Sequence, residues 1–462
     1  MESYDLIVIG AGQGGGPLAG AFARAGRRTA LIERAHVGGT CVNVGCTPTK
    51  TMVASARVAH VSRRAIAYGV RVAVTGVDMS IVRQRKRAIV ESFRSGSERG
   101  LERSGVEVVR GTARFTAPQT IEVQQGDSRT SLTADTIVLD TGLITAIPPV
   151  SGLGEVPYLT SSSIMELDEV PEHLLVLGGG YVGLEFAQMF HRFGSRVTVL
   201  QRDAQLLSRE DQDVAEEIAT ILRDDGIDVR LGVEAREVRH ANGEVELTCA
   251  EVSSSSEGRV SGTHLLVATG RVPNTEPLNL AAAGVEVDAR GFVRVNARLE
   301  TTSPGVFALG DVTGGPAFTH VSYDDFRILR ENLLEGGQAS TEGRILPYTV
   351  FIDPQLGRVG LTEREAAASG RRIRVARLPM DKVARARETD ETLGFMKAVV
   401  DADSGLILGA SVLGIDGGEI ATLFQLAMMG GLPYTRLRDG MFSHPTVGES
   451  LNNLFMALNR ES

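Results

Sequence analysis

Two apolar runs in the chain each lead directly into a glycine-rich turn and then into an apolar helical stretch. The first run, DLIVI at residues 5–9, is β-rich and unbroken, which predicts a strand buried on both faces. It continues into GAGQGG, which places Gly10, Gly12 and Gly15 at the GxGxxG spacing, and a second predicted strand, RTALIE, ends at Glu33.

Each part of this pattern has a physical role in a dinucleotide site. Glycines let the backbone approach a pyrophosphate at the N-terminus of a helix, and an acid after the second strand accepts hydrogen bonds from a ribose hydroxyl. Because strand, glycine turn, helix, second strand and Glu33 occur in this order, the segment predicts a dinucleotide-binding fold.

The same pattern recurs at residues 173–202. Gly178, Gly180 and Gly183 repeat the spacing, and the following strand ends at Gln201 and Arg202. Two such units in one chain predict two bound dinucleotides that exchange electrons. The second unit has no acid at its strand end, and the cation of Arg202 suits a 2′-phosphate, which favours NADPH. Glutamine can also bond a ribose, so NADH stays open.

The remaining segments are consistent with an α/β protein. Residues 53–105 have a helical pattern, and residues 107–140 alternate as strands do. The Pro- and Gly-rich stretch at residues 147–157 marks a domain boundary. From about residue 341 strands and helices continue without a glycine fingerprint, which predicts a separate α+β domain.

Composition excludes several classes of protein. At 462 residues the chain is long enough for several domains, and its net charge of −9 argues against a nucleic-acid partner. The first residues have no basic region before their apolar run, and no apolar run reaches the length of a membrane span. We therefore expect a cytoplasmic protein without a membrane partner.

Two of the three cysteines, Cys41 and Cys46, lie five positions apart in GGTCVNVGCTPTK. A disulfide there closes too short a loop to add much stability, and a closed zinc site needs four ligands, so we expect no metal site. Redox chemistry is the remaining use. In a regular helix the two α-carbons would be roughly 8.6 Å apart, too far for a disulfide. Gly45 would permit the required distortion.

These segments resemble the class I flavoprotein disulfide reductases, the family that includes mercuric reductase, dihydrolipoamide dehydrogenase and glutathione reductase. GAGQGG, GGTCVNVGCTPTK, GGGYVGLEFA, ATGRVPNT, GVFALGD and HPTVGES follow in the family's order. The resemblance implies FAD at the first site and NAD(P)H at the second. It also implies an FAD-binding domain at 1–148, an NAD(P)H-binding domain at 149–271, a central return at 272–340 and a dimerisation domain at 341–462.

The resemblance also implies roles for individual residues. Cys46 is similar to the charge-transfer thiol beside the flavin, and Cys41 to the interchange thiol that meets the substrate. Lys50 and Glu185 are similar to an ion pair near the flavin N5, where an ammonium would stabilise the reduced flavin. The other residues implied at the cofactors are Asp311 at the ribityl chain, Tyr181 over the nicotinamide pocket, and Gly39, Thr40, Ala113, Thr141, Gly142, Gly270 and Arg271.

His444 and Glu449 near the C-terminus are candidates for proton transfer. Electron flow through a dithiol also moves protons, and the unperturbed pKa of histidine suits this task near neutrality. Glu449 would orient the imidazole. In the family this pair enters the active site from the partner subunit, so the resemblance implies a homodimer with a shared active site.

The electron acceptor is left open by the sequence. The chain ends NLFMALNRES without the second cysteine pair of mercuric reductases, and Gln201 stands where dihydrolipoamide dehydrogenases place a glutamate. We expect a reductase of a small disulfide, a metal ion or a related oxidant. The alternatives are a dihydrolipoamide dehydrogenase of a 2-oxoacid complex and a flavin-binding dimer without turnover. Asp140 and the segment Leu143–Thr145 depart from the family pattern.

Overall fold

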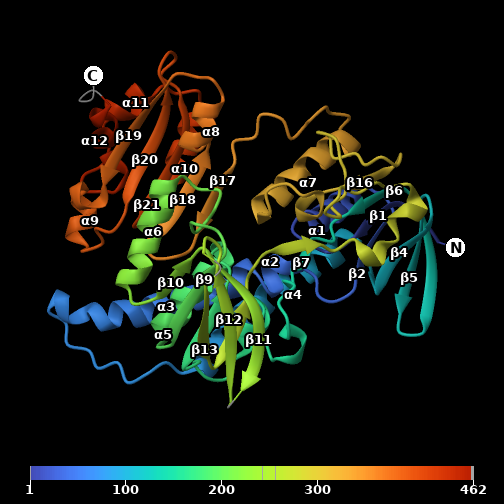
Figure 1. Cartoon of the computed structure of the whole chain (residues 1–462). Coiled ribbons are helices and arrows are strands. Elements are labelled where there is room, and N and C mark those ends of the chain that lie inside the picture. The colour runs from blue at the N-terminus through green and yellow to red at the C-terminus, as the bar shows by residue number, and fades with distance from the viewer. Residues whose placement is uncertain (1, 242, 255, 459–462) are drawn as a thin grey trace. The chain divides into compact units, whose positions relative to one another are not determined.

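Both predicted dinucleotide folds are present in the computed structural model, which describes residues 2–241, 243–254 and 256–458 (Figure 1). The chain forms two compact units. The first consists of Met1–Met52, Ser80–Ala146 and Gly270–Arg344, and the second of Val53–Met79, Ile147–Thr269 and Ile345–Ser462.

The first unit is built on a mixed sheet whose strands come from all three of its segments. The strands of this sheet are β1 (Glu2–Ile9), β2 (Thr29–Glu33), β3 (Glu107–Arg110), β4 (Thr112–Ala117), β5 (Thr120–Gln125), β6 (Ser128–Leu139) and β16 (Val306–Ala308). A separate two-stranded sheet consists of β7 (Leu143–Thr145) and β15 (Arg271–Pro273). The helices of the unit are α1 (Gly15–Arg24), α2 (Gly39–Asn43), the start of α3 (Cys46–Arg64), α4 (Met79–Ser104) and α7 (Thr319–Leu334).

The long strand β6 joins two parts of this sheet. From Leu132 to Leu139 it runs parallel to β1, with Ile9 opposite Leu139. Its first residues pair with β5 in an antiparallel meander, and its last three pair with β16 in parallel. The carboxyl ends of β1, β2, β6 and β16 therefore lie at one edge, where ligands of open α/β sheets bind.

Alternate residues of β1 enter different cores, as predicted for a strand buried on both faces. Leu6 and Val8 pack with residues of α1 and α7. Ile7 and Ile9 pack on the other face with residues of β4 and β5. Burial on both faces explains the unbroken apolar run.

The second unit repeats the dinucleotide fold on a smaller scale. Four parallel strands have the order β10-β9-β8-β14, and a three-stranded antiparallel sheet has the order β11-β12-β13. The elements are β8 (His173–Leu177), α5 (Tyr181–Phe193), β9 (Arg196–Gln201), α6 (Gln212–Asp224), β10 (Asp228–Leu231), β11 (Val233–Ala241), β12 (Glu244–Glu251), β13 (Glu257–Gly262) and β14 (His264–Val267).

The C-terminal part of the second unit is a five-stranded antiparallel sheet with the order β17-β18-β21-β20-β19. Helix α10 packs against β17, β18 and β21, and α12 packs against β19 and β20 (Figure 1). The elements are β17 (Pro347–Val350), β18 (Gln355–Gly360), α8 (Glu363–Ala368), β19 (Ile373–Pro379), α9 (Ala384–Glu388), β20 (Phe395–Asp401), β21 (Ile407–Gly414), α10 (Gly417–Met429), α11 (Tyr434–Arg438) and α12 (Leu451–Ala457).

The predicted fold class, two Rossmann-like folds plus an α+β region, is confirmed. The helical pattern predicted for residues 53–105 is wrong at 69–78, where no regular structure forms between α3 and α4. Gly69 with φ 77° and Gly76 with φ 154° interrupt the helix there, and β-branched valines between them favour extended backbone. Within the part of the chain that the structure describes, every helix is too short or too polar to span a membrane.

The domain limits that the sequence predicts, at residues 148, 271 and 340, stay a prediction.

Close packing between β18 and α10 gives a test of the C-terminal fold. A Cβ on Gly357 would lie 2.0 Å from the carbonyl oxygen of Gly417, the first residue of α10. Because backbone cannot yield locally, Gly357→Ala should lower the free energy of unfolding by about 1–3 kcal/mol.

The matched control is Gly96→Ala in α4, where an added Cβ meets nothing within 4 Å. It should raise stability by about 0.5–1 kcal/mol because alanine loses less backbone entropy in a helix. Thermal unfolding at fixed protein concentration measures both. Equal midpoints for the two variants would contradict the close contact.

Candidate active site

The first glycine turn is held close to the end of β6. Gly10 has φ 106°, and a Cβ there would lie 2.2 Å from the carbonyl oxygen of Asp140. Helix α1 begins at Gly15, so its N-terminal N–H groups face the turn. Backbone this close to a strand end has no room for side chains, which is what an approaching pyrophosphate requires.

Glu33 lies beside this turn at the end of β2. One carboxylate oxygen accepts a hydrogen bond from Ala11 N at 3.0 Å, and the other accepts one from Ala35 N at 2.8 Å. Each carboxylate oxygen can accept a further bond, so the acid keeps capacity for a ribose hydroxyl.

The cysteine segment is fastened to the same turn. Gly38 N donates to Ala11 O at 2.8 Å, and Gln13 Nε2 donates to Gly38 O at 3.0 Å. A Cβ on Gly39 would lie 2.8 Å from the α-carbon of Gly12. The predicted cofactor residues Gly39 and Thr40 open helix α2 at this contact, so the cysteines start next to the dinucleotide turn.

Cys41 and Cys46 lie in two successive helices rather than in one distorted helix. Cys41 is in α2, Val44 and Gly45 separate the helices, and Cys46 is the first residue of α3. A Cβ on Gly45 would lie 2.8 Å from Thr40 O. Gly45 is therefore the residue that lets the second helix start so soon, which brings the two sulfurs within reach of each other.

The two thiols interact. A hydrogen bond with Cys46, followed by burial, raises the pKa of Cys41, while Thr319 and Lys50 act in the opposite direction. Lys50 is therefore close enough to influence the pair electrostatically. Its predicted partner Glu185 belongs to the second compact unit, so the Lys50–Glu185 ion pair stays a prediction.

Thr319 is a site residue that sequence analysis missed. It is the first residue of α7, and its Oγ1 lies 3.4 Å from Cys46 Sγ. Cys46 is thus next to the N-termini of two long helices, α3 and α7, whose partial positive charges favour a thiolate. No spacing in the sequence marks this contact, because the two residues are 273 positions apart.

Asp311 lies at the same sheet edge, in the turn that follows β16. Its Oδ2 is 3.3 Å from Arg271 Nη1, and Arg271 also donates to Leu143 O at 3.0 Å. Burial raises the pKa of Asp311, and the Arg271 charge opposes the rise. The unusual segment Leu143–Thr145 forms β7, which pairs with β15 and so positions Arg271.

The other predicted FAD residues lie in the same unit. Thr141 and Gly142 follow Asp140, and the Thr141 hydroxyl is buried with no hydrogen-bond partner among the described residues. Gly270 has φ 142° and its carbonyl accepts from Ala146 N at 3.0 Å. Ala113 is buried in the core through β4. An unsatisfied hydroxyl beside a glycine cradle fits a polar cofactor such as FAD.

The second glycine turn repeats the first. A Cβ on Gly178 would lie 2.4 Å from Ala268 O, and one on Gly183 would lie 2.1 Å from Gly178 O. Gly180 caps α5. Gln201 Oε1 accepts a hydrogen bond from Gly179 N at 2.8 Å, the same relation that Glu33 has to Ala11.

Arg202 follows Gln201 and projects into solvent. Its side chain is 71% exposed, and its Nε lies 3.8 Å from Asp203 Oδ1. Gln201 Nε2 also donates to Asp203, at 3.1 Å. The arrangement leaves a cation at the strand end where a 2′-phosphate would lie, with one carboxylate beside it.

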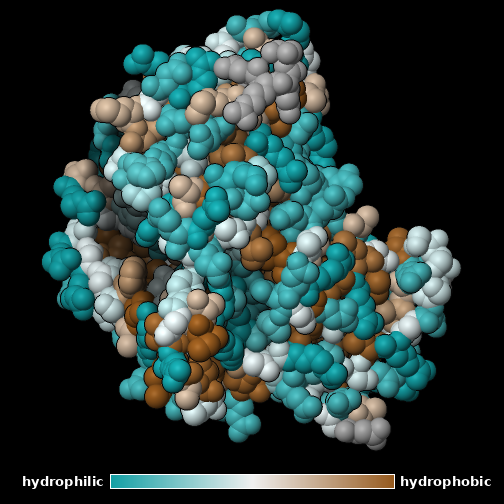
Figure 2. Space-filling model, turned by 90° about the vertical axis from the view of Figure 1, so that its left-hand side faces the viewer, coloured by the Kyte–Doolittle hydropathy of each residue, from teal (hydrophilic) through white to brown (hydrophobic). Residues whose placement is uncertain are grey.

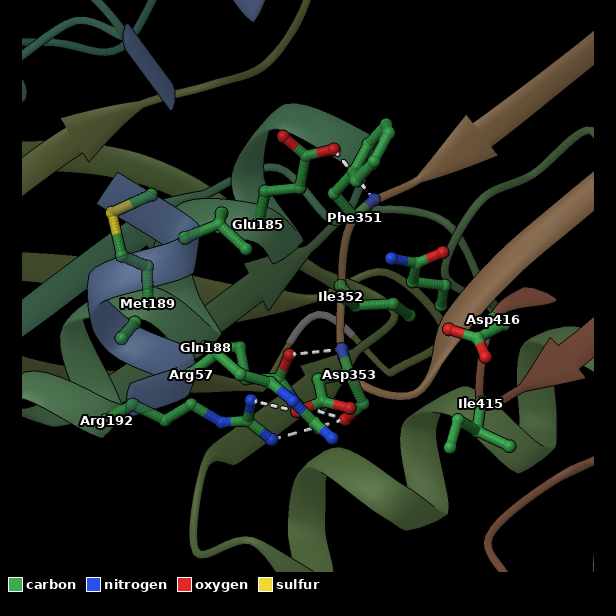
Figure 3. Close-up of a pocket in the computed structure, with 13 residues that line it drawn as sticks. Arg57, Glu185, Gln188, Met189, Arg192, Phe351, Ile352, Asp353, Ile415 and Asp416 are labelled. Carbon is green, nitrogen blue, oxygen red and sulfur yellow. Dashed lines mark hydrogen bonds and ion pairs between the residues drawn. The ribbon is translucent and has the colours of Figure 1, made fainter. Parts of the chain in front are cut away.

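Tyr181 and Glu185 are one helical turn apart at the start of α5, so they lie on the same face. Glu185 is buried, and its Oε1 accepts a hydrogen bond from Phe351 N at 2.9 Å. It lines a cavity of about 110 Å³ with Arg57, Arg192 and Asp353 (Figure 3).

Asp353 stabilises the loop whose Phe351 N–H binds Glu185. It pairs with Arg57 and, at 2.5 Å, with Arg192, while Gln188 bonds its backbone N–H at 2.7 Å and its carbonyl at 2.8 Å (Figure 3). Burial acts to raise the pKa of Asp353, but the two arginine charges outweigh it and hold the pKa below its usual range. Because the arginines are neutralised, this cavity supports Glu185 rather than forming an anion site.

His444 and Glu449 are brought together as predicted. Nδ1 of His444 lies 2.9 and 3.0 Å from the two carboxylate oxygens of Glu449. The imidazole is 72% exposed, whereas the carboxylate is largely covered. The carboxylate of Glu449 therefore holds the imidazole by Nδ1, and Nε2 points away from the carboxylate.

The third cysteine, Cys249, is buried in β12, and burial raises its pKa.

Comparison with known proteins identifies the class. The chain belongs to the pyridine nucleotide-disulphide oxidoreductase family, whose model matches residues 4–325, and residues 346–455 match the dimerisation domain of that family. The predicted family is confirmed. The protein is an oxidoreductase that uses FAD and NAD(P)H, and its dimerisation domain indicates a homodimer.

Within this family, the chain is similar to RclA and to mercuric reductases. The probable pyridine nucleotide-disulfide oxidoreductase RclA of Escherichia coli (strain K12) is 40% identical over 460 residues, which covers 98% of this chain and 99% of RclA. The mercuric reductase of Bacillus cereus is 34% identical over 459 residues, 99% of this chain and 72% of that protein. The structure of the Cu(II) complex of HOCl-induced flavoprotein disulfide reductase RclA from Escherichia coli matches with a TM-score of 0.90 at 39% identity, over 99% of both chains.

The contact between Thr319 and Cys46 can be tested by thiol reactivity. Thr319→Val keeps the shape of the side chain but removes the hydroxyl, so the thiolate form of the pair should lose a charge-assisted hydrogen bond worth ~1.5 kcal/mol. Alkylation by iodoacetamide should then require a pH about one unit higher. The control is Thr51→Val. Thr51 lies in α3, five positions after Cys46, and its hydroxyl donates to Thr47 O rather than to a sulfur. Superimposable alkylation profiles for wild type and Thr319→Val would contradict the contact.

Proposed function

We propose that this protein carries electrons from NADPH through FAD and the Cys41–Cys46 pair to a thiophilic metal ion, with Cu(II) as the first candidate. The observation that carries the proposal is the placement of Cys46 at the N-terminus of α3, 3.4 Å from Thr319 at the N-terminus of α7. Such a site favours thiolates, which are both the nucleophiles of disulfide exchange and soft metal ligands.

The relatives support a metal ion as acceptor. RclA of Escherichia coli has been solved as a Cu(II) complex, and several relatives at 33–35% identity are mercuric reductases. Soft sulfur ligands also suit Cu(I), the product of one-electron reduction. Because Cys46 is exposed and Cys41 is partly exposed, we infer that the ion reaches this pair directly.

The electron balance of the proposed reaction is simple. FAD held at the first glycine turn would supply the two electrons of a nicotinamide hydride to the Cys41–Cys46 disulfide, whose S–S bond breaks as the two sulfurs take up two protons. The resulting dithiol reduces two Cu(II) ions by one electron each, while two S–H bonds break and one S–S bond forms. Two protons leave, and His444 of the partner subunit is the base that takes one of them, with its ring held by Glu449.

Exposed apolar side chains support an active site shared between subunits. The face of the molecule in Figure 2 is mostly hydrophilic but carries clusters of hydrophobic residues. Among the C-terminal residues, Leu426, Met429 and Met441 are exposed, and Met441 is fully so. Large exposed apolar side chains mark interaction surfaces. Met441 is three positions from His444, so a partner that covers this surface would also receive His444.

NADPH is the proposed electron donor. Gln201 is neutral and already accepts the Gly179 N–H, so it does not repel a phosphate, and Arg202 is an exposed cation next to it. The carboxylate of Asp203 weakens the attraction of Arg202 for a 2′-phosphate. NADH is therefore the weaker alternative donor. We also infer a cytoplasmic location, since structural disulfides are rare in the cytosol and cysteine pairs there are usually catalytic or redox-sensing.

A second candidate is the oxidation of dihydrolipoamide. The dihydrolipoyl dehydrogenase of Thermus scotoductus is 34% identical over the full chain. The absence of an acid at Gln201 argues against this role, because an NAD-linked enzyme would use a carboxylate on the adenosine ribose. Faster flavin reduction by dihydrolipoamide than by NADPH would favour it.

Rapid-mixing kinetics of the purified holoenzyme test the proposal. NADPH should reduce the flavin, and reoxidation should be fastest with Cu(II) or Hg(II) among a panel that includes lipoamide, glutathione disulfide, quinones and oxygen. Cys46→Ser should slow metal reduction by at least about two orders of magnitude, because electrons leave through the thiol pair. The matched control, Cys249→Ser, should retain the wild-type rate. Cu(I) formation at an unchanged rate in Cys46→Ser would show direct transfer from the flavin.

Arg202→Ala tests the choice of nucleotide. A charge-assisted contact with the 2′-phosphate is worth about 1.5 kcal/mol, so the KM for NADPH should rise roughly tenfold while that for NADH stays constant. Arg196→Ala, at the opposite end of β9, is the control and should change neither value. An equal rise with both nucleotides would remove the argument for NADPH.

A further inference from the structure

Asp140 lies directly under the glycine turn of the FAD site. Its backbone N–H donates to Ile9 O at 2.8 Å, and its Oδ2 accepts a hydrogen bond from Gly15 N, at the start of α1, at 2.7 Å. A Cβ on Gly12 would lie 2.5 Å from the same oxygen. The carboxyl group therefore fills the hollow of the turn and contacts the helix N-terminus that faces the pyrophosphate.

The surroundings of this carboxyl group are acidic. Asp140 is 8% exposed, and the charges that act on it come from Asp311 after β16, Asp325 on α7 and Glu33 at the end of β2. The basic groups nearby are already paired: Arg271 with Asp311 at 3.3 Å, and Arg344 with Asp325 at 2.5 Å. In the part of the chain that the structure describes, no arginine or lysine pairs with Asp140 itself.

Burial raises the pKa of Asp140 well above its usual range. The Gly15 hydrogen bond opposes this shift, and the charges of Asp311, Asp325 and Glu33 add to it. A neutral acid can still accept the Gly15 N–H through its carbonyl oxygen. The ionised form would instead place a negative charge against the α1 N-terminus, where it would repel the pyrophosphate and compete for the same helix dipole.

We propose that Asp140 positions the FAD-binding turn as a neutral carboxylic acid, so that FAD binding is coupled to the protonation of this residue. FAD binds tightly while Asp140 carries its proton, and ionisation of Asp140 weakens binding. The sign follows from linkage: the FAD complex binds one more proton than the apoprotein wherever the latter is ionised. FAD affinity is then constant at low pH and falls by up to about tenfold per pH unit once Asp140 ionises.

The test is the affinity of apoprotein for FAD, followed by quenching of flavin fluorescence over the whole pH range in which the apoprotein stays folded. Wild type should lose affinity as pH rises. Asp140→Asn keeps the size and the acceptor oxygen but cannot ionise, so its affinity should be independent of pH and should exceed that of wild type at the alkaline end. Asp135→Asn is the matched control, since it removes a carboxyl group at an exposed position of β6, the strand that ends just before Asp140; it should follow wild type.

Several outcomes would overturn the proposal. A pH-independent affinity of the wild-type protein contradicts it directly, even if Asp140→Asn does not fold. If the FAD affinity of Asp140→Asn falls with rising pH in parallel with that of wild type, the proton belongs to another group. Apoprotein that binds no FAD at any pH contradicts the FAD site itself. Thermal unfolding of the apoprotein is a second readout: Asp140→Asn should gain stability over wild type as pH rises, because only wild type then carries an ionised buried carboxylate.

Discussion

The parallel pairing of β1 with β6 is the constraint on which the first unit depends. Both strands are buried on both faces. Because they are parallel, their carboxyl ends lie at the same edge of the sheet, with Ile9 opposite Leu139. The turn after β1 must then pass the backbone of Asp140 so closely that only glycine fits at Gly10. The start of α1, the cysteine segment and the start of α7 are each held by contacts to this edge. The redox chemistry is therefore located by strand pairing, and the cysteines themselves add little to the fold.

The second unit applies the same geometry with a different chemical outcome. Glu33 and Gln201 accept a backbone N–H from equivalent positions of their glycine turns, at 3.0 and 2.8 Å. The hydrogen bond that shapes the turn is thus preserved when the acid is replaced by an amide. What changes is the charge available to a nucleotide, which is negative beside the first turn and, through Arg202, positive beside the second. One fold can in this way present two different charges to a bound dinucleotide.

Local sequence patterns predicted the parts of this molecule that local physics determines. The glycine turns, the strand ends at Glu33 and Gln201, and the proximity of His444 to Glu449 all follow from residues a few positions apart. The break at Gly45 was also predictable, although it separates two helices where a distorted single helix was expected. Thr319 could not be found, because its contact with Cys46 depends on how α7 packs against α1 and the sheet. The pairing of β7 with β15 likewise joins segments more than a hundred residues apart.

The burial of Cys249 in β12 has a practical consequence for anyone who handles the enzyme. A sulfhydryl reagent applied to native protein reaches Cys41 and Cys46 but not Cys249, since Cys249 is shielded by the core and disfavoured as a thiolate. Colorimetric counting of reactive sulfhydryls before and after denaturation therefore reports the oxidation state of the Cys41–Cys46 pair directly. The single sulfhydryl of Cys249, which reacts only after denaturation, gives the protein concentration against which the number of reduced Cys41 and Cys46 sulfhydryls can be compared.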